Sequence, residues 1–314
     1  MMPLRSPLLV LSLAATCSLY AQVAQVRMVP DELNVNVDGK PFTIFHFGKD
    51  ANKPFLAPLR SASGKIITRG FPMENIAGES RDHLHHRGLW FSYDDINGVK
   101  FWENDPSYTK GAIGKIVVAH ADVKENKGST TLTADMEWRS PNNKVMLVED
   151  RVMVFRSDAQ LRIIDFTITL TASEDVTIGD TKEGAFAIRL TDAFTEKKGL
   201  KIVDADGRNR MVNVWGKRSN WVDYSTDVDG EKIGVAMFDH PQNPGHPTYW
   251  HARDYGLFAL NPFGQHAFDP NMPERVVKLA AGNKLVYRWR VLIHPGDAET
   301  AHVADLYKEY SAKP

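Results

Sequence analysis

The chain of 314 residues has one cysteine, Cys17, which lies in an N-terminal segment typical of a secretory signal peptide. In that segment Arg5 supplies a positive charge, residues 8–15 are apolar, and Ala21 offers a cleavage point, with Ala24 as a rival. Lipidation of Cys17 is the less favoured interpretation. Removal of residues 1–21 would leave a chain without cysteine, which excludes disulfides and thiol nucleophiles. The sequence therefore predicts an exported protein, periplasmic or extracellular.

Long apolar runs, an excess charge and nucleotide motifs are also missing. No later stretch approaches the roughly 20 apolar residues of a membrane span. Lys and Arg number 38 against 39 Asp and Glu, so charge gives no reason to expect a nucleic-acid partner or an anionic membrane surface. The chain has neither the glycine-rich loops of nucleotide sites nor the GxSxG elbow, so no nucleotide cofactor is expected.

What the sequence does contain is a repeated alternation of apolar and polar residues. Residues 130–139 and 285–293 alternate with a period of two, and residues 145–155 and 160–171 are rich in β-branched side chains and alternate too. Clusters of Ser, Pro, Asn, Asp and Gly separate these segments and are typical of tight turns. The pattern predicts a mainly β fold, a large antiparallel β-sandwich.

Helix signals are sparse. After Pro295 and Gly296, the residues Val303, Leu306 and Tyr310 recur at helical spacing, which predicts one C-terminal helix on the outside of the sandwich. No linker is visible, so we expect a single domain over residues 22–314. A division into two sheets near residue 175 is the alternative.

Two long irregular segments, residues 69–111 and 204–273, are candidates for function because long loops in compact domains tend to carry it. The first contains His83, His85 and His86, followed by Arg87. If this stretch is extended, His83 and His85 point to one face and can bind a divalent metal ion with a third ligand from elsewhere. Each imidazole can also act as a general acid or base. A hydrogen-bonded turn is the structural alternative.

Four further residues have side chains suited to acid–base chemistry. Arg253 suits bidentate binding of a carboxylate or a planar polar group. Asp254 could orient that arginine or act as a base, and Tyr255 could donate a proton. Glu183 is a candidate base if a cation lies near it. For each, an ion pair or a solvated turn is the structural alternative.

The remaining candidates are a stiff loop and a set of aromatic residues. His240 lies in a segment, residues 239–247, whose three prolines fix its shape; a plain rigid connector is the alternative. Aromatic faces in a cleft can stack on a sugar ring, although single tryptophans more often anchor loops to the core. The residues assigned to substrate binding are Trp90, Trp102, Trp221, His246, Trp250, His251 and Asn261.

Five short motifs occur in a fixed order: HLHHRGLW from His83, GVKFW from Gly98, DHPQNP from Asp239, RDYG from Arg253 and NPFG from Asn261. Over residues 35–295 the chain resembles the bacterial family labelled "methane oxygenase PmoA", also carried as a domain of unknown function. Members of that family resemble exported proteins of polysaccharide-degrading bacteria. Their β-rich pattern is similar to the supersandwich of aldose mutarotases and some polysaccharide lyases, which implies a concave sheet face that holds a sugar. Methane chemistry is not implied, since the membrane subunit of that name spans the bilayer.

Three hypotheses follow from these observations. The first is a carbohydrate-active enzyme, a lyase, epimerase or hydrolase, in which a histidine, Arg253 and Tyr255 act on a sugar or glycan. Because no pair of carboxylates suited to a glycoside hydrolase is evident, lyase and epimerase reactions are weakly favoured over hydrolysis. The second is a non-catalytic glycan-binding module. The third is a metalloprotein with His83 and His85 as ligands.

Overall fold

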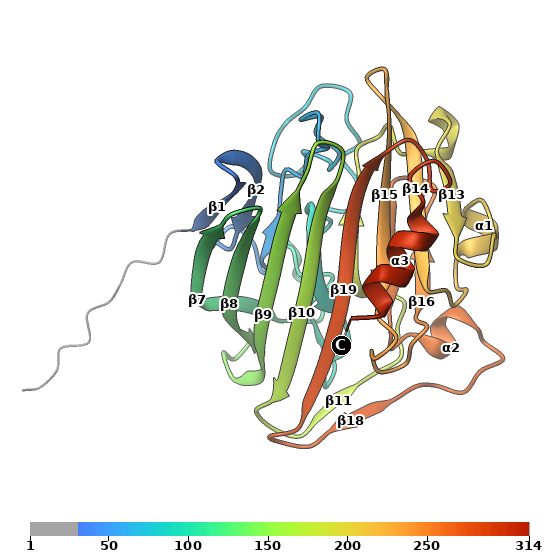
Figure 1. The fold of residues 1–314 in the computed structure, drawn as a ribbon. Coiled ribbons are helices and arrows are strands. Elements are labelled where there is room, and N and C mark those ends of the chain that lie inside the picture. Colours follow the sequence, from blue (N-terminus) through green and yellow to red (C-terminus); the bar gives the residue numbers. More distant parts are fainter. Residues whose placement is uncertain (1–30, 314) are drawn as a thin grey trace, which may run out of the picture.

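The computed structural model describes residues 31–313, and the expected signal peptide lies outside these residues. Two antiparallel sheets form the molecule (Figure 1). The eight-stranded sheet has the order β13 (Lys201–Asp204), β14 (Trp221–Val228), β15 (Glu231–Asp239), β19 (Lys284–Pro295), β10 (Arg162–Ala172), β9 (Val145–Ser157), β8 (Ser129–Arg139) and β7 (Lys115–Asn126). The seven-stranded sheet has the order β1 (Glu32–Val37), β2 (Lys40–His46), β3 (Phe55–Leu56), β4 (Leu89–Tyr93), β12 (Gly184–Arg189), β17 (Leu257–Asn261) and β16 (Tyr249–Ala252). Each sheet draws strands from both sides of residue 175.

Smaller elements connect these sheets. Two short pairs join β11 (Val176–Ile178) to β18 (Val277–Leu279) and β5 (Val99–Lys100) to β6 (Ala112–Ile113). The helices are a 3-10 turn (Glu196–Lys198), α1 (Met211–Val214), α2 (Gln265–Phe268) and α3 (Val303–Ser311). None of these helices has the length and apolar character needed to cross a membrane. The predicted mainly β sandwich is confirmed, and so is its C-terminal helix.

The strands predicted from alternation form the middle of the larger sheet. In β8 the residues Thr130, Leu132, Ala134, Met136 and Trp138 are buried, whereas most of their neighbours are not. A period of two places every second side chain on one face, so this alternation fixes which face meets the core. The strand β10 pairs along its whole length with β9 and along nearly all of it with β19.

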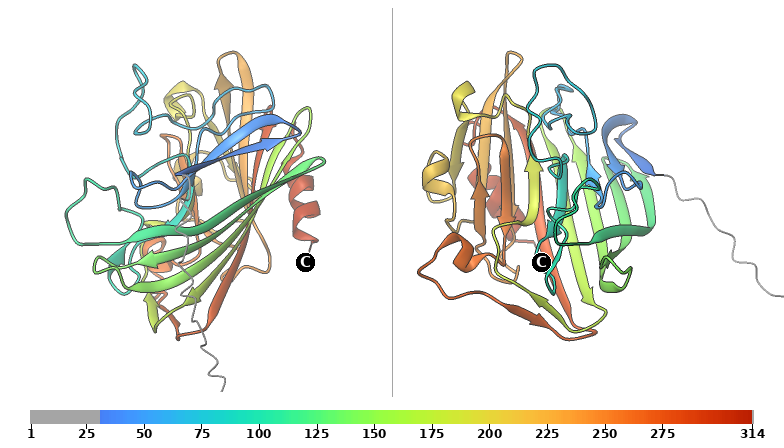
Figure 2. Two further views of the ribbon diagram at one scale, coloured as in Figure 1. Left: turned by 90° about the vertical axis from the view of Figure 1, so that its left-hand side faces the viewer. Right: turned by 180° about the vertical axis from the view of Figure 1, so that it is seen from behind.

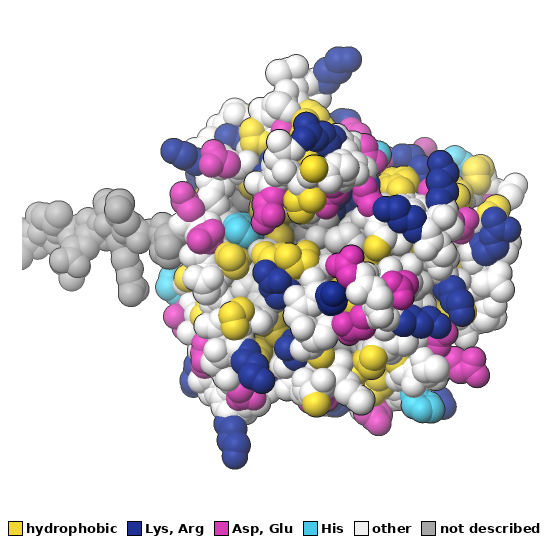
Figure 3. Space-filling model, turned by 90° about the horizontal axis from the view of Figure 1, so that it is seen from above, with side chains coloured by type: hydrophobic (Ala, Val, Ile, Leu, Met, Phe, Trp, Pro, Cys, Tyr) yellow, Lys and Arg dark blue, Asp and Glu magenta, His cyan; other side chains and the backbone are white. Residues whose placement is uncertain are grey.

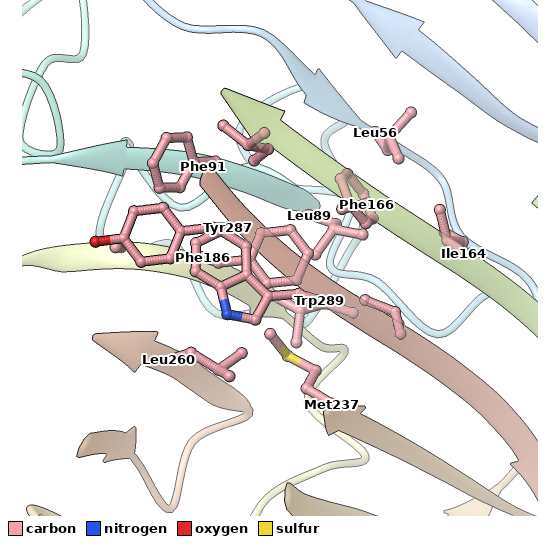
Figure 4. Close-up of a cluster of buried hydrophobic side chains, with 14 of the residues drawn as sticks. Leu56, Leu89, Phe91, Ile164, Phe166, Phe186, Met237, Leu260, Tyr287 and Trp289 are labelled. Atoms are coloured by element: carbon pink, nitrogen blue, oxygen red, sulfur yellow. The ribbon is translucent and has the colours of Figure 1, made fainter. Parts of the chain in front are cut away.

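Large aromatic side chains fill the space between the two sheets (Figure 4). Trp289 of β19 stacks on Phe186 of β12 with ring centroids 5.0 Å apart, so the two sheets meet in direct ring contact. Phe91 of β4 packs beside the same indole at 5.6 Å. Because the inward side chains of β4, β12 and β17 are held in this core, the side chains that alternate with them face the opposite surface.

The outer face of the eight-stranded sheet is covered by α3, as predicted. Val303, Tyr307 and Tyr310 of the helix are buried against Phe238 and its neighbours on the sheet. Figure 2 shows the helix on one side of the molecule and the blue-to-teal loops of the N-terminal third on the other. The two outer faces of the sandwich therefore have different covers, a helix on one and irregular chain on the other.

The outer face of the seven-stranded sheet carries a second, smaller apolar cluster. It contains Trp90 of β4, Ala187 of β12, Leu257 of β17 and, from the covering loops, Trp102. These residues pack between the sheet and the irregular segment above it. The cluster forms a firm floor on which polar side chains from several loops are placed.

Candidate functional site

A polar hollow of about 220 Å³ lies above this floor. Four segments that are far apart in the sequence supply its walls, which are formed by His83, His85, His86, Glu103, Lys182, Glu183, His251, Arg253, Tyr255 and Leu257. Convergence of such remote polar groups on one concave place costs loop-closure entropy and has no local cause. It is therefore the strongest single sign of a functional site.

A larger hollow, of about 560 Å³, lies on the other face of the sandwich beside α3. Its lining includes Trp221, Val203 and Ala298 and contains no histidine. Volume alone would favour this second hollow as a binding site. We place the candidate site in the smaller hollow, because acid–base chemistry needs titratable groups that face one another.

The three clustered histidines lie in a tight turn, not in a strand. The backbone N–H of His86 donates to the carbonyl of His83 at 2.9 Å, and His83 has a positive φ of 46°. The condition of an extended stretch is therefore not met, since β4 begins only at Leu89, and the local geometry is that of the hydrogen-bonded turn. In the turn, the ring of His83 stacks on that of His86 at 4.6 Å, and the ring of His85 meets His86 edge-on at 4.4 Å. All three rings gather at one wall of the hollow.

Two buried arginines hold this turn in place. Arg69 donates to the carbonyls of His83 and His86, at 3.0 and 3.2 Å. The Asp82 carboxylate accepts from both Arg69 and Arg189, and its second oxygen lies 2.9 Å from Nδ1 of His83. Burial alone raises the pKa of Asp82, but the charge of Arg189, together with His83 and Arg69, holds that pKa below its usual range. Asp82 therefore stays ionised and fixes the orientation of the His83 ring.

The buried imidazoles of the hollow are neutral. Burial, and then the charge of Lys53, lowers the pKa of His85, and burial likewise brings the pKa of His86 well below its usual value. For His251, burial and the nearby Arg253 lower the pKa to about 3. These three rings can donate and accept hydrogen bonds at neutral pH, but they do not supply a proton. The side chain of His83, by contrast, is 40% exposed and lies beside the Asp82 carboxylate.

Two of the predicted sugar-stacking residues support the histidines from behind instead. Trp90 and Trp102 are 1% and 0% exposed, with ring centroids 4.9 Å apart. His86 stacks on Trp90 at 5.4 Å. Beneath them the ammonium of Lys53 donates to the Trp102 carbonyl at 2.6 Å. The expectation that these two indoles contact a sugar is corrected, because both are buried within the apolar cluster beneath the hollow.

The turn that joins β16 to β17 supplies another part of the lining. Tyr255 stacks against His83 at 5.5 Å, and the guanidinium groups of Arg189 and Arg253 lie over its ring at 4.5 and 5.4 Å. The hydroxyl of buried Tyr224, on the other sheet, donates to the Arg253 carbonyl and accepts from its N–H, at 2.9 and 2.8 Å. The core of the sandwich therefore fixes the backbone from which Arg253 projects.

The proline-rich loop does not reach the hollow. Asp239 is buried and accepts from His246, the Thr248 N–H and the Asn243 amide. His240 packs edge-on against Tyr310 of α3 at 5.2 Å. The candidate roles of His240 and His246 in catalysis or sugar binding are corrected: the loop is the rigid connector of the alternative interpretation, and it holds the end of the helix.

Other predicted site residues also lie elsewhere. Trp250 is fully buried in the main core and donates to the Ser219 carbonyl, and Trp221 lies beneath α3. Asn261 is buried and accepts from the backbone N–H groups of the turn that follows it. Arg87 pairs with Asp105 and faces a neighbouring hollow. These expectations are corrected. Trp250, Trp221 and Asn261 are buried, and Arg87 already has an ion-pair partner.

Asp254 is the last of these corrections. It is exposed and does not line the hollow, although Arg253 and Tyr255 on either side of it do. The turn directs alternate side chains in different directions. The other candidates all line the one hollow: His83, His85, His86, Glu183, His251, Arg253 and Tyr255. Their part in a site and their chemical roles stay predictions.

His83 and His85 lack the further ligands that a metal ion would need. Among residues 31–313, no group of three His, Cys, Asp or Glu side chains is arranged to hold one. Because a protein metal site needs several ligands around the same point, the geometry does not fit the ion of the third hypothesis.

Sequence reasoning missed the residues that position the site. Asp82 directly precedes the histidine motif but was assigned no role, and Arg189 ends a strand whose other residues are all apolar. A charged residue in such a strand signals a buried partner, since an isolated buried charge is costly. For Arg69 and Tyr224 the sequence carries no comparable signal, because their partners are distant in the chain.

The fold and the hollow define a β-sandwich protein with a small polar hollow on the outer face of one sheet. Residues 32–308 match a family described as "Family of unknown function (DUF6807)". The chain belongs to that family. This agrees with the expected domain of unknown function, and none of the comparisons carries the methane oxygenase label. No curated protein matches the sequence.

Several solved structures have a similar fold at low identity. The GH36 α-galactosidase AgaA from Geobacillus stearothermophilus is 8% identical, with a TM-score of 0.43 over 86% of this chain and 41% of that one. A galactose mutarotase related enzyme from Lactobacillus acidophilus is 10% identical, with a TM-score of 0.38 over 83% and 97%. A galactose mutarotase-like protein from Clostridium acetobutylicum is 8% identical, with a TM-score of 0.36 over 84% and 98%. The chain spans less than half the length of the α-galactosidase.

Proposed function

We propose that this protein is an exported carbohydrate-active enzyme that binds one sugar unit in the hollow and acts on it by proton transfer. The observation that carries the proposal is the convergence of His83, Glu183, Arg253 and Tyr255 on one polar hollow. About 220 Å³ is below the usual range of sites for drug-sized ligands and suits a small polar one. Neutral imidazoles of both donor and acceptor capacity are well matched to sugar hydroxyls.

His83 is the general acid or base of this proposal. Asp82 holds Nδ1, which leaves Nε2 as the nitrogen available to a ligand. A carboxylate in this position fixes the ring orientation and stabilises the protonated imidazole. His85 and His86 contribute hydrogen bonds only, because both remain neutral. Of the expected acid–base histidines, His83 is therefore the one whose environment suits proton transfer.

Glu183 and Tyr255 are placed to handle the second proton. Both line the hollow together with His83, and Tyr255 is in ring contact with it. Glu103 is the only other carboxylate in the lining, and each of the two carboxylates contacts a lysine. Neither lies in an apolar pocket, the setting typical of the catalytic acid of a glycoside hydrolase. Removal of a proton from a sugar carbon, in epimerase or lyase chemistry, is therefore favoured over hydrolysis.

The test is turnover of a panel of oligosaccharides and monosaccharides, with products resolved by NMR and mass spectrometry. We expect His83→Gln to lower kcat by about 10²- to 10⁴-fold with an unchanged melting temperature, the usual contribution of a general acid or base. Asp82→Asn should lower kcat less and shift the pH profile, since it removes the orienting charge but leaves the ring.

His240→Gln is the matched control, because this imidazole lies at the helix end and not in the hollow. Its turnover should equal that of the wild type. Full activity in His83→Gln would overturn the assignment of the site. Sugar binding without any product over long incubation, with the binding abolished by changes in the hollow, would instead identify a glycan-binding module.

A further inference from the structure

We infer that the sugar bound in the hollow carries a carboxylate, as a uronic acid does, and that the Arg253 guanidinium binds it. This rests on the proposed function and names its substrate class. The starting observation is the charge balance of the lining. Besides the histidines, the lining contains two acidic side chains, Glu103 and Glu183, and two basic ones, Lys182 and Arg253.

Three of these four charges are already paired. Lys182 contacts Glu183, and Glu103 lies 2.5 Å from Lys100 just outside the hollow. For Arg253, no ion pair or side-chain hydrogen bond is formed with any residue of the described range 31–313, and its Nε atom is buried without an acceptor. The hollow therefore holds one uncompensated cation.

The neighbouring arginine differs from Arg253 in one respect, a carboxylate partner. Arg189 also lies over the Tyr255 ring, and it donates to the Asp82 carboxylate at 2.8 Å. Its Nε is buried without an acceptor, as that of Arg253 is, so the two differ in the carboxylate alone. A planar carboxylate that accepts two parallel N–H bonds is the acceptor that best matches a guanidinium. A carboxylate on the ligand would give Arg253 the partner that Asp82 gives Arg189.

The rest of the lining argues for a sugar acid and against a fully charged ligand such as a phosphate. His85, His86 and His251 are held neutral, so they add hydrogen bonds and no further positive charge. A phosphate site normally gathers several cations or a set of backbone N–H groups. One free guanidinium beside neutral polar groups matches one carboxylate attached to a ring of hydroxyls.

The test is isothermal titration calorimetry with D-glucuronate and D-galacturonate against D-glucose and D-galactose. We expect each uronate to bind the wild-type protein at least tenfold more tightly than its neutral counterpart. Arg253→Met should remove this discrimination, and Arg253→Lys should restore only part of it, because an ammonium cannot form the bidentate contact. Lys201→Met, which removes an exposed cation on the other face of the sandwich, is the control and should behave as wild type.

Three results would overturn the inference. One is equal binding of uronates and neutral sugars by the wild type. A second is discrimination that survives in Arg253→Met. A third is tighter binding of D-glucose 6-phosphate than of D-glucuronate, which would make the hollow a phosphate site.

The failure of this inference can be told apart from failure of the proposed function. If neutral sugars are turned over and His83→Gln abolishes that turnover, the substrate class is wrong and the acid–base site stands. If no sugar of either kind binds or reacts, both proposals fall together.

Discussion

Acidification should destabilise this protein through the hollow itself. His85, His86 and His251 are neutral in the folded protein because burial lowers the pKa of each. In the unfolded chain the same rings have the ordinary pKa of about 6.5 and take up protons as the pH falls. Below that pH the unfolded state binds more protons than the folded state. Their contribution to stability is thus complete above pH 6.5 and is lost progressively in acid.

The size of the effect follows from proton linkage. With a folded pKa of about 3, His251 stays neutral down to pH 5. Each such histidine then costs about 2 kcal/mol of unfolding free energy between pH 7 and pH 5, and three cost about 6 kcal/mol. A total stability of about 5–15 kcal/mol is usual for a domain, so a loss of this size is large.

For one histidine, His294, acidification increases its contribution to stability. Burial alone lowers the pKa of His294, but the Asp223 carboxylate 2.7 Å away more than offsets this and raises it. Its contribution is present below pH 6.5 and is lost as the pH rises through the folded pKa. Between pH 7 and pH 5 this gain is less than about 1 kcal/mol, because the unfolded ring is itself mostly protonated by pH 5. The net loss from these four histidines is therefore about 5 kcal/mol.

The assay is urea unfolding at pH 5, 6 and 7, followed by tryptophan fluorescence. His251→Gln should reduce the loss of stability between pH 7 and pH 5 by about 2 kcal/mol, whatever its effect at pH 7. His294→Gln should make the loss larger. Parallel pH profiles for the wild type and His251→Gln would refute the reasoning, because they would mean that the folded protein protonates this ring as readily as the unfolded chain does.

Two further predictions concern stability away from the hollow. Glu149 and Arg151 form an ion pair inside the sandwich, with side chains 0% and 2% exposed; Glu149→Gln should cost about 3–5 kcal/mol in urea unfolding, because it leaves a buried guanidinium without its anion. The double variant Glu149→Leu, Arg151→Met should recover most of that loss, and a loss as large as in the single variant would contradict the argument. His240→Ala should weaken the docking of α3 by about 1 kcal/mol, since it removes the bond to the Lys313 carbonyl. Hydrogen exchange of the helix amides checks this, and unchanged protection would show that the loop does not hold the helix.

The distribution of charged side chains on the surface agrees with the net charge of the sequence, which is close to zero. Figure 3 shows cationic and anionic side chains interspersed on the face seen from above. Such mixing gives no extended field of one sign on this face. Recognition of a charged ligand therefore depends on single groups such as Arg253 and not on a general attraction.

The sequence by itself determined the middle strands of the larger sheet and the C-terminal helix. Alternation over residues 130–139 and 285–293 follows directly from the geometry of a strand, in which neighbours two apart share a face. The same local rule applies to Val303 and Tyr310 at helical spacing. These features depend on residues a few positions apart, so the sequence shows them without knowledge of the rest of the fold.

Only the tertiary structure decided which candidates form the site. Tryptophans and histidines of the same irregular segments divide between the core and the hollow: Trp90 is buried while His83 is exposed. That division, and the pairing of Asp82 with two arginines, depends on strands and loops far away in the chain. Exposure, ion pairing and pKa are set by whatever neighbours the complete fold supplies, and no local pattern of residues records those neighbours.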